Sequence, residues 1–255
     1  MKQIKKSVAA PLPLQKYCSE NPLGDWDSFR RNNKRYQSVA KLIQMDQRGL
    51  CAYCEIDFLE KTTEKNLPDF RVEHFHPKSP HFPPPNWGLD WTNLFGTCHG
   101  GSQKDVVDPT RFTAPDLCCD VPKKDFDWTN DILSPLIDIP AFPLIFKFSE
   151  STGKIEVDPV ACPADKFDKA SDSLIKLNLN APRLMEMRLQ VIMGLQDQII
   201  KLTEEGSTPA DAAKKISIAM YKSNVADSWP AFFSCIRWYL GTAADDRLMN
   251  IGYGQ

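Results

Sequence analysis

The arrangement of the cysteines constrains the fold of this chain more than any other feature. Cys51 and Cys54 form a Cys-x-x-Cys pair, Cys98 follows much later, and the adjacent Cys118 and Cys119 lie about 20 positions beyond it. A tight Cys-x-x-Cys turn presents two thiolates to one ion, and a structural zinc site needs four tetrahedral ligands. The cysteines therefore predict a zinc site that joins distant segments, with either Cys118 or Cys119 as its fourth ligand.

Two alternatives to a zinc site are a redox motif, which a Cys-x-x-Cys pair can form, and simple burial, since free cysteines are common in protein cores. A redox role is disfavoured because the pair follows a predicted helix and no βαβ pattern surrounds it. The remaining Cys18, Cys162 and Cys235 have no partner at ligand spacing, so we assign them to the structure.

The bulk properties indicate an ordinary soluble protein. The chain has 255 residues, of which 42% are apolar and 25% charged, enough for one large domain or two small ones. No apolar run is long enough to span a membrane, and the N-terminal residues lack the apolar stretch of a signal peptide. We therefore expect a cytoplasmic protein in a reducing compartment, with thiols rather than disulfides. The formal net charge of −2 neither supports nor excludes a nucleic-acid partner.

The hydrophobic pattern divides the chain into three predicted parts. These are an N-terminal arm and helix (1–50), a core that holds most of the Cys, His and Trp residues (51–135), and a β-hairpin followed by helices that we expect to bind a partner (136–255). Periodicity and turn residues predict the individual elements. They are an extended arm to Leu23, a helix over 26–50, a hairpin over 144–157 with Gly153 at its turn, an amphipathic helix over 184–202, a helix opened by Thr208-Pro209, and an aromatic helix from Ser228 through Leu240.

A carboxylate and an imidazole lie side by side between the two halves of the predicted zinc site, in the run Arg71-Val-Glu-His-Phe-His-Pro-Lys-Ser79. Glu73 can bind a hard divalent cation through oxygen. His74 can accept a proton from water near neutral pH. A Glu-His pair alone is common and usually means a surface Glu beside a half-buried His. The flanking cysteines favour a catalytic role, in which a metal ion assists the hydrolysis of a phosphodiester.

The motifs in this region together resemble a known family. Cys-x-x-Cys, Glu-His-x-x-Pro-Lys-Ser, Trp-x-Asn-Leu and then Cys98 are similar to the zinc-containing form of the HNH, or ββα-metal, endonuclease core. The resemblance implies an α+β fold, with a zinc-stapled ββα-metal HNH core embedded in a mostly helical protein. It also implies that His74 is the general base, that Glu73 binds a catalytic Mg²⁺ or Mn²⁺, and that Asn93 pins the loop that orients the base.

The last family motif is similar to Cys119-Asp120-Val-Pro-Lys123, where the family pattern is Cys-Asn-x-x-Lys. In common members the third and fourth cysteines lie a few residues apart, whereas here Cys98 and Cys119 are well separated. Asp120 also replaces the usual Asn or His, although a carboxylate binds Mg²⁺ at least as well as an amide oxygen. We favour Asp120 as the second ligand of the catalytic metal, with His99 as the alternative.

Basic residues near the predicted base are candidates for phosphate contact. His76 follows His74 by two positions, so on a continuing strand it would share the same face. Lys78 and Lys123 are further candidates, although either one is by default a solvated lysine.

Shorter matches place the chain in one branch of the family. Ile-Lys-Lys-Ser near the start, Leu50–Glu55, Leu133–Leu136 and Lys176–Asn180 occur in the order seen in PtuB-like proteins, over roughly residues 1–190. Those proteins are the HNH nuclease subunits of Septu-type and retron-associated anti-phage systems. The resemblance implies an ABC-type ATPase partner (PtuA-like) and a nucleic-acid substrate, DNA rather than RNA, although a transfer RNA is conceivable. The alternatives are a non-catalytic zinc-bearing adaptor or a nucleic-acid-binding module, neither of which needs Glu73 and His74.

Overall fold

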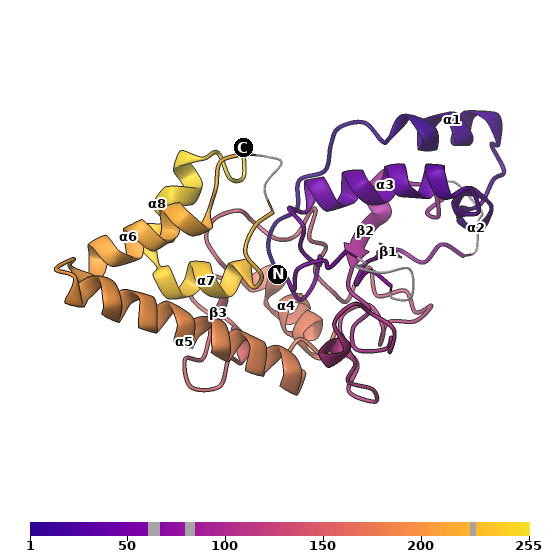
Figure 1. The fold of residues 1–255 in the computed structure, drawn as a ribbon. Coiled ribbons are helices and arrows are strands. Elements are labelled where there is room, and N and C mark those ends of the chain that lie inside the picture. Colours follow the sequence, from indigo (N-terminus) through magenta and orange to yellow (C-terminus); the bar gives the residue numbers. More distant parts are fainter. Residues whose placement is uncertain (61–66, 80–84, 225–227) are drawn as a thin grey trace.

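The computed structural model describes residues 1–60, 67–79, 85–224 and 228–255. Figure 1 shows α1–α3 and the β1–β2 pair on one side of the molecule and α5–α8 on the other, with the N-terminus between them. None of the described helices is long and apolar enough to cross a membrane. The elements are α1 (Leu12–Glu20), α2 (Trp26–Arg30), α3 (Asn33–Asp46), β1 (Arg71–His74), the 3-10 helix η1 (Trp91–Asn93), β2 (Leu94–Thr97), the 3-10 helix η2 (Pro109–Arg111), β3 (Phe146–Phe148), β4 (Ile155–Val157), α4 (Ala164–Lys176), α5 (Pro182–Glu204), α6 (Pro209–Met220), α7 (Phe233–Leu240) and α8 (Thr242–Asn250).

The N-terminal part is more helical than its sequence pattern predicts. The prediction of an extended arm to Leu23 was wrong, because the arm contains α1, and Pro13 in its first turn is compatible with a helix. The single helix predicted over 26–50 is two helices, since Asn32 caps α3 by accepting a hydrogen bond from the Arg35 backbone N–H. Helix α3 ends at Asp46, and Gly49, three residues later, has the left-handed conformation (φ +75°) that favours glycine.

The two strands of the core pair antiparallel, with Glu73 opposite Phe95 and His74 opposite Leu94. Gln47, the buried residue that ends helix α3, supports this pair. The Gln47 amide donates to the Gly96 carbonyl over 2.9 Å and accepts from the Gly96 N–H over 2.7 Å. The paired amide fixes the position of β2 relative to the end of α3.

The overall class is α+β and mostly helical, as predicted. The third element of the ββα pattern takes another form here. Within residues 98–145, all of which the structure describes, the chain forms η2 and a series of turns over 119–125 but no α-helix. Pro115 and Pro122 and the left-handed Gly100 and Gly101 account for this difference, because neither residue type favours a continuous helix.

The C-terminal part follows the predicted order of a hairpin and then helices. Strands β3 and β4 pair antiparallel, and Gly153 lies at their turn with φ +67°. Helices α5 and α6 occur where the pattern predicted them, but the aromatic helix α7 begins at Phe233 rather than near Ser228. The reason is that Phe232 is left-handed and donates its N–H to the Glu55 carbonyl over 2.8 Å, which places it outside the helix. The division of the chain into residues 1–50, 51–135 and 136–255 stays a prediction. One buried hydrophobic cluster contains residues of all three parts.

Gly153 generates a test of this fold. A Cβ at this position would lie 2.0 Å from the Met185 carbonyl oxygen of α5, and the positive φ would strain any side chain. Gly153→Ala should therefore lower the free energy of unfolding by about 2 kcal/mol or more. Gly194→Ala is the control, because nothing lies within 4 Å of its Cβ in the middle of α5, and it should raise the stability by about 0.5–1 kcal/mol. Urea unfolding measures both, and equal effects would contradict the packing described here.

Candidate active site and zinc centre

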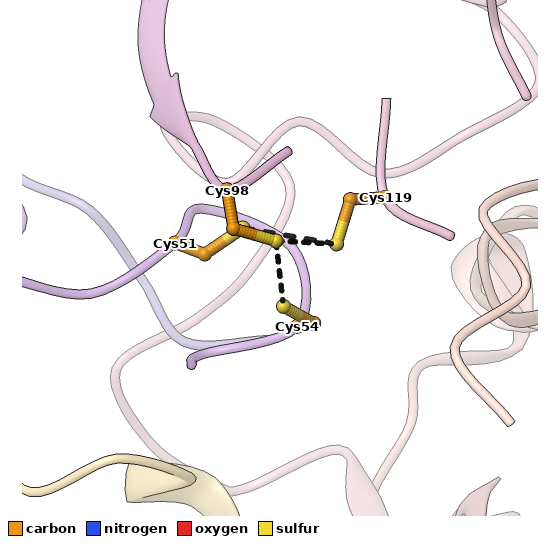
Figure 2. Close-up of side chains that lie close together, drawn as sticks. All are labelled: Cys51, Cys54, Cys98 and Cys119. Carbon is orange, nitrogen blue, oxygen red and sulfur yellow. Dashed lines mark hydrogen bonds between the residues drawn. The ribbon is translucent and has the colours of Figure 1, made fainter. Parts of the chain in front are cut away.

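Four cysteine thiols meet at one buried point. Cys51 and Cys54 come from the loop after α3, Cys98 follows the last residue of β2, and Cys119 comes from the turns over 119–125 (Figure 2). Their Sγ atoms lie within 4.8 Å of one another. The Cys51–Cys119, Cys54–Cys98 and Cys98–Cys119 distances are 3.8, 3.7 and 3.5 Å. A tetrahedral zinc ion with Zn–S bonds of about 2.3 Å has S–S edges of roughly 3.8 Å. The four thiols therefore fit a structural zinc ion.

The structure also distinguishes the two adjacent cysteines. Cys119 has a left-handed backbone (φ +62°), which turns its thiol toward the cluster, whereas Cys118 stays outside it. The Cys118 Sγ accepts a hydrogen bond from Arg183 Nη2 over 3.2 Å. The guanidinium places a positive charge beside a site whose four thiolates outweigh the charge of one zinc ion.

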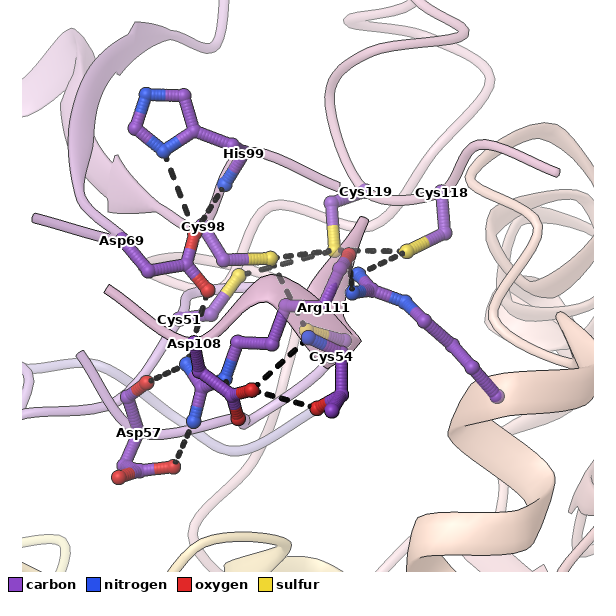
Figure 3. A network of polar contacts seen from close by, with 12 residues as sticks. Cys51, Cys54, Asp57, Asp69, Cys98, His99, Asp108, Arg111, Cys118 and Cys119 are labelled. Atoms are coloured by element: carbon purple, nitrogen blue, oxygen red, sulfur yellow. Dashed lines mark hydrogen bonds and ion pairs between the residues drawn. The ribbon is translucent and has the colours of Figure 1, made fainter. Parts of the chain in front are cut away.

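A network of ion pairs centred on the buried Arg111 and Asp69 lies beside the cysteines (Figure 3). Arg111 donates to Asp69 Oδ2 over 2.8 Å and to the carbonyl and carboxylate oxygens of Asp57 over 2.7 Å each. Asp69 Oδ1 accepts from the His99 backbone N–H over 2.7 Å, and the His99 ring lies 3.3 Å from it. His99 thus belongs to this network and does not line the cleft that holds Glu73. Arg111 and Asp69 were not predicted from the sequence, because isolated charged residues carry no local signal of burial.

Glu73 and His74 line a cleft of about 370 Å³, which we call the active-site cleft. Strand β1 forms one wall, the turns over 119–125 form another, and helices α2 and α3 face them. The residues that α2 and α3 contribute were not predicted, because nothing in their local sequence points to a distant strand. The lining residues are Trp26, Arg30, Tyr36, Arg71, Val72, Glu73, His74, Pro77, Lys78, Asp120, Val121, Lys123, Lys124 and Asp125.

Two carboxylates in the cleft face two cations. Glu73 Oε1 lies 2.5 Å from Lys123 Nζ, and Asp120 Oδ2 lies 2.6 Å from Arg71 Nη2. Burial and the negative charge of Asp120 raise the pKa of Glu73 to about 8. The buried Asp120 Oδ1 has no hydrogen-bond partner among the described residues. Two neighbouring carboxylates with an unused oxygen are the ligand type that Mg²⁺ and Mn²⁺ prefer, so these residues fit a divalent cation.

His74 is held in one orientation. Its Nε2 lies 3.1 Å from the Gly88 carbonyl oxygen, and its ring packs edge-to-face against Trp26 with a centroid distance of 5.0 Å. A carbonyl oxygen only accepts, so Nε2 carries the proton and Nδ1 keeps the lone pair. Burial lowers the pKa of His74 to about 4, so the ring is neutral at pH 7 and able to accept a proton.

Asn93 joins both ends of the segment after β1. Its Oδ1 accepts from the His76 N–H over 2.7 Å, and its Nδ2 donates to the carbonyls of His76 and Trp87 over 2.8 and 2.7 Å. Trp87 precedes Gly88, whose carbonyl contacts the His74 ring. Between these two ends, residues 80–84 lie outside the described part of the chain.

The three candidates for phosphate contact all have partners within the molecule. The expectation that His76 shares a strand face with His74 was wrong, because β1 ends at His74; the His76 ring stacks on Trp87 instead, with a centroid distance of 4.5 Å. Lys78 lines the cleft and pairs with Asp27 over 2.8 Å. Lys123 is only 2% exposed, and its ammonium donates to Glu73 and to the His74 carbonyl. Phosphate contact by any of them stays a prediction.

Comparison with known proteins identifies the class of enzyme. No protein-family model matches the chain. Over 213 residues, the chain is 33% identical to the Escherichia coli protein named "Retron Ec83 putative HNH endonuclease", a match that covers 75% of this chain and 79% of that protein. The chain therefore belongs to the HNH endonuclease family, whose members are hydrolases that act on phosphodiester bonds.

The two adjacent cysteines provide a matched test of the zinc site. Cys119→Ser removes a thiolate from the cluster and should lose the zinc together with several kcal/mol of stability, on the order seen when structural zinc sites are broken. Cys118→Ser keeps an acceptor for Arg183 and should retain about one zinc per chain. Elemental analysis and thermal unfolding of the purified variants measure both properties. If Cys118→Ser loses the zinc and Cys119→Ser retains it, Cys118 is the fourth ligand and Cys119 is not.

Proposed function

We propose that this protein is a metal-dependent HNH endonuclease that hydrolyses phosphodiester bonds of nucleic acid in anti-phage defence. The observation that carries the proposal is the convergence of three groups in one cleft. A neutral, oriented His74 lies beside two carboxylates, Glu73 and Asp120, that fit a divalent cation. A zinc-bearing adaptor would need neither the imidazole nor the paired carboxylates.

The reaction begins with proton transfer to His74. Because its Nε2–H is held by the Gly88 carbonyl, Nδ1 is the atom that accepts a proton from the attacking water. Asn93 and Trp26 restrict movement of the segment and of the ring, so the base is oriented before substrate arrives. Glu73 and Asp120 would hold Mg²⁺ or Mn²⁺, which would supply Lewis-acid stabilisation of the charge that develops at the phosphate.

Other charged residues of the cleft suit the backbone of a nucleic acid. Arg30, Lys78 and Lys124 line the cleft and can neutralise phosphates without reading base sequence. Proton removal from water requires no 2′-hydroxyl, so DNA is the favoured substrate. The same chemistry cuts RNA, and the similarity to a protein of a retron keeps a transfer-RNA substrate as the alternative.

The biological setting is part of the proposal. The similarity to a retron protein and the PtuB-like motifs support a cytoplasmic role in a Septu-type or retron-associated system. The nuclease then works with an ABC-type, PtuA-like ATPase subunit. Co-expression of the two subunits and their co-purification as one complex tests this partnership directly.

His74→Ala tests the mechanism. Loss of the general base should lower divalent-metal-dependent cleavage of DNA by about 10²–10⁴-fold without loss of zinc. His99→Ala is the control, because His99 lies outside the cleft, and it should keep activity within a few-fold of the unmodified protein. Initial cleavage rates on labelled DNA and RNA substrates measure both variants. Undiminished cleavage by His74→Ala would refute the assignment of the base.

Asp120→Asn tests the second ligand of the catalytic metal. Loss of one carboxylate charge should weaken Mn²⁺ binding by at least about tenfold, while the zinc content stays unchanged. Calorimetric titration with Mn²⁺ measures the affinity independently of cleavage. If His99→Ala weakens Mn²⁺ binding and Asp120→Asn does not, His99 is the ligand.

A further inference from the structure

A second cavity lies away from the active-site cleft, between the N-terminal segment, the end of α3 and the C-terminal residues. Its volume is about 370 Å³, within the range of small-molecule sites. Among the described residues, its lining shares no member with that of the active-site cleft. We call it the Lys2 cavity, and the residues that matter below are Lys2, Lys5, Asp46, Arg48 and Trp229.

Lys2 is a buried cation without an ion-pair partner in the described part of the chain. Its side chain is 4% exposed, and its ammonium lies 5.4 Å from the centroid of the Trp229 ring. Glu55 attracts it at longer range, but that carboxylate already accepts hydrogen bonds from the Ser234 N–H and hydroxyl over 2.8 and 2.6 Å. Burial lowers the pKa of Lys2 to about 8. A buried ammonium without a counter-ion lowers the stability of the fold, so an anion bound in the cavity would stabilise it.

A second buried donor lines the same cavity. Trp229 Nε1 is buried and has no hydrogen-bond partner among the described residues. A buried indole N–H normally finds an acceptor. The Gln3 side-chain amide, whose Oε1 also lacks a partner among these residues, offers a further donor when the amide is turned over.

The charge of the lining favours an anion. Arg48 lies over the Trp229 ring with a distance of 5.1 Å to its centroid, and the exposed Lys5 lies in the lining. Asp46 is the only carboxylate side chain among the described lining residues. Both of its oxygens already accept hydrogen bonds from Ser7, from the N–H over 2.8 Å and from the hydroxyl over 2.7 Å. The lining thus carries three cationic side chains (Lys2, Lys5 and Arg48) against one carboxylate side chain, and the buried Trp229 N–H has no acceptor among the described residues. Arg48 also donates to the Asn224 carbonyl over 2.6 Å.

We propose that the Lys2 cavity binds a phosphate-type oxyanion, with the Lys2 ammonium and the Trp229 indole N–H as its buried donors and Lys5 and Arg48 as surrounding charge. The phosphate can be free or carried by a nucleotide or a nucleic-acid strand, since the donors recognise the same oxygens in each. This site is separate from the phosphodiester that the nuclease cuts, so the inference does not depend on the proposed function.

Thermal unfolding of the full-length protein in inorganic phosphate tests the site, with chloride at equal ionic strength as the reference. At a phosphate concentration a hundredfold above Kd, the Tm should rise by about 5–10 °C. Lys2→Met should raise the Tm in chloride, because it removes a buried charge, and should abolish the increment due to phosphate. Lys16→Met, an exposed lysine on α1, is the matched control and should keep the increment.

Two further variants separate the Lys2 cavity from general effects of phosphate on the protein. Trp229→Phe keeps an aromatic side chain but removes the N–H, so it should weaken phosphate binding several-fold while the protein remains folded. Lys124→Gln changes the active-site cleft and should leave the increment intact. A nucleoside monophosphate and a short DNA oligonucleotide, tested in place of phosphate, show which carrier binds best. An equal phosphate increment in the unmodified protein, Lys2→Met and Trp229→Phe, or no increment in the unmodified protein, would overturn the proposal.

Discussion

The four-thiolate cluster is the constraint on which the rest of this structure depends. It joins the loop after α3, the end of β2 and the turns over 119–125, three segments that have little regular structure to hold them together. Cys98 directly follows the strand that pairs with Glu73 and His74, and Cys119 directly precedes Asp120. A metal ion such as zinc, bound by these four thiols, would fix both walls of the active-site cleft at once and would hold them without the α-helix of the ββα pattern.

Electrostatics shapes the cleft that the cluster holds. Asp120 lies close enough to Glu73 for its charge to raise the pKa of Glu73, and a fold that buried the two carboxylates without cations would be destabilised. Lys123 and Arg71 offset this repulsion, each paired with one carboxylate. The ammonium of Lys123 is enclosed, so it acts as a fixed internal charge that also holds the His74 carbonyl. The paired charges offset the cost of burial, and the buried Asp120 Oδ1 has no hydrogen-bond partner among the described residues.

Local motifs made part of this site predictable. Residue types that bind metals at short spacing led to the cysteine cluster, and the family resemblance led to Glu73, His74 and Asn93. The choice between Cys118 and Cys119 could not be read from the sequence, because both carry the same thiol and a single backbone angle decides between them. The ion pair of Arg111 with Asp69 could not be predicted either. Each residue taken alone is expected to be exposed to solvent, and only the fold brings the two charges together. Trp26 lines the cleft from α2 and packs against His74, a contact between distant segments that the local sequence pattern does not encode.

The orientation of His74 shows how short-range and long-range determinants combine. Strand β1 ends at His74, so the backbone after it can leave the sheet. The Asn93 side chain fixes this backbone by accepting a hydrogen bond from the His76 N–H. The same amide fixes Trp87, and the next residue supplies the carbonyl that selects the imidazole tautomer. Asn93 itself stands immediately before β2, which α3 and Cys98 hold in place. The tautomer of His74 is therefore set by a chain of contacts that begins at the four-cysteine cluster, so that a defect in the cluster would disturb the imidazole without touching it.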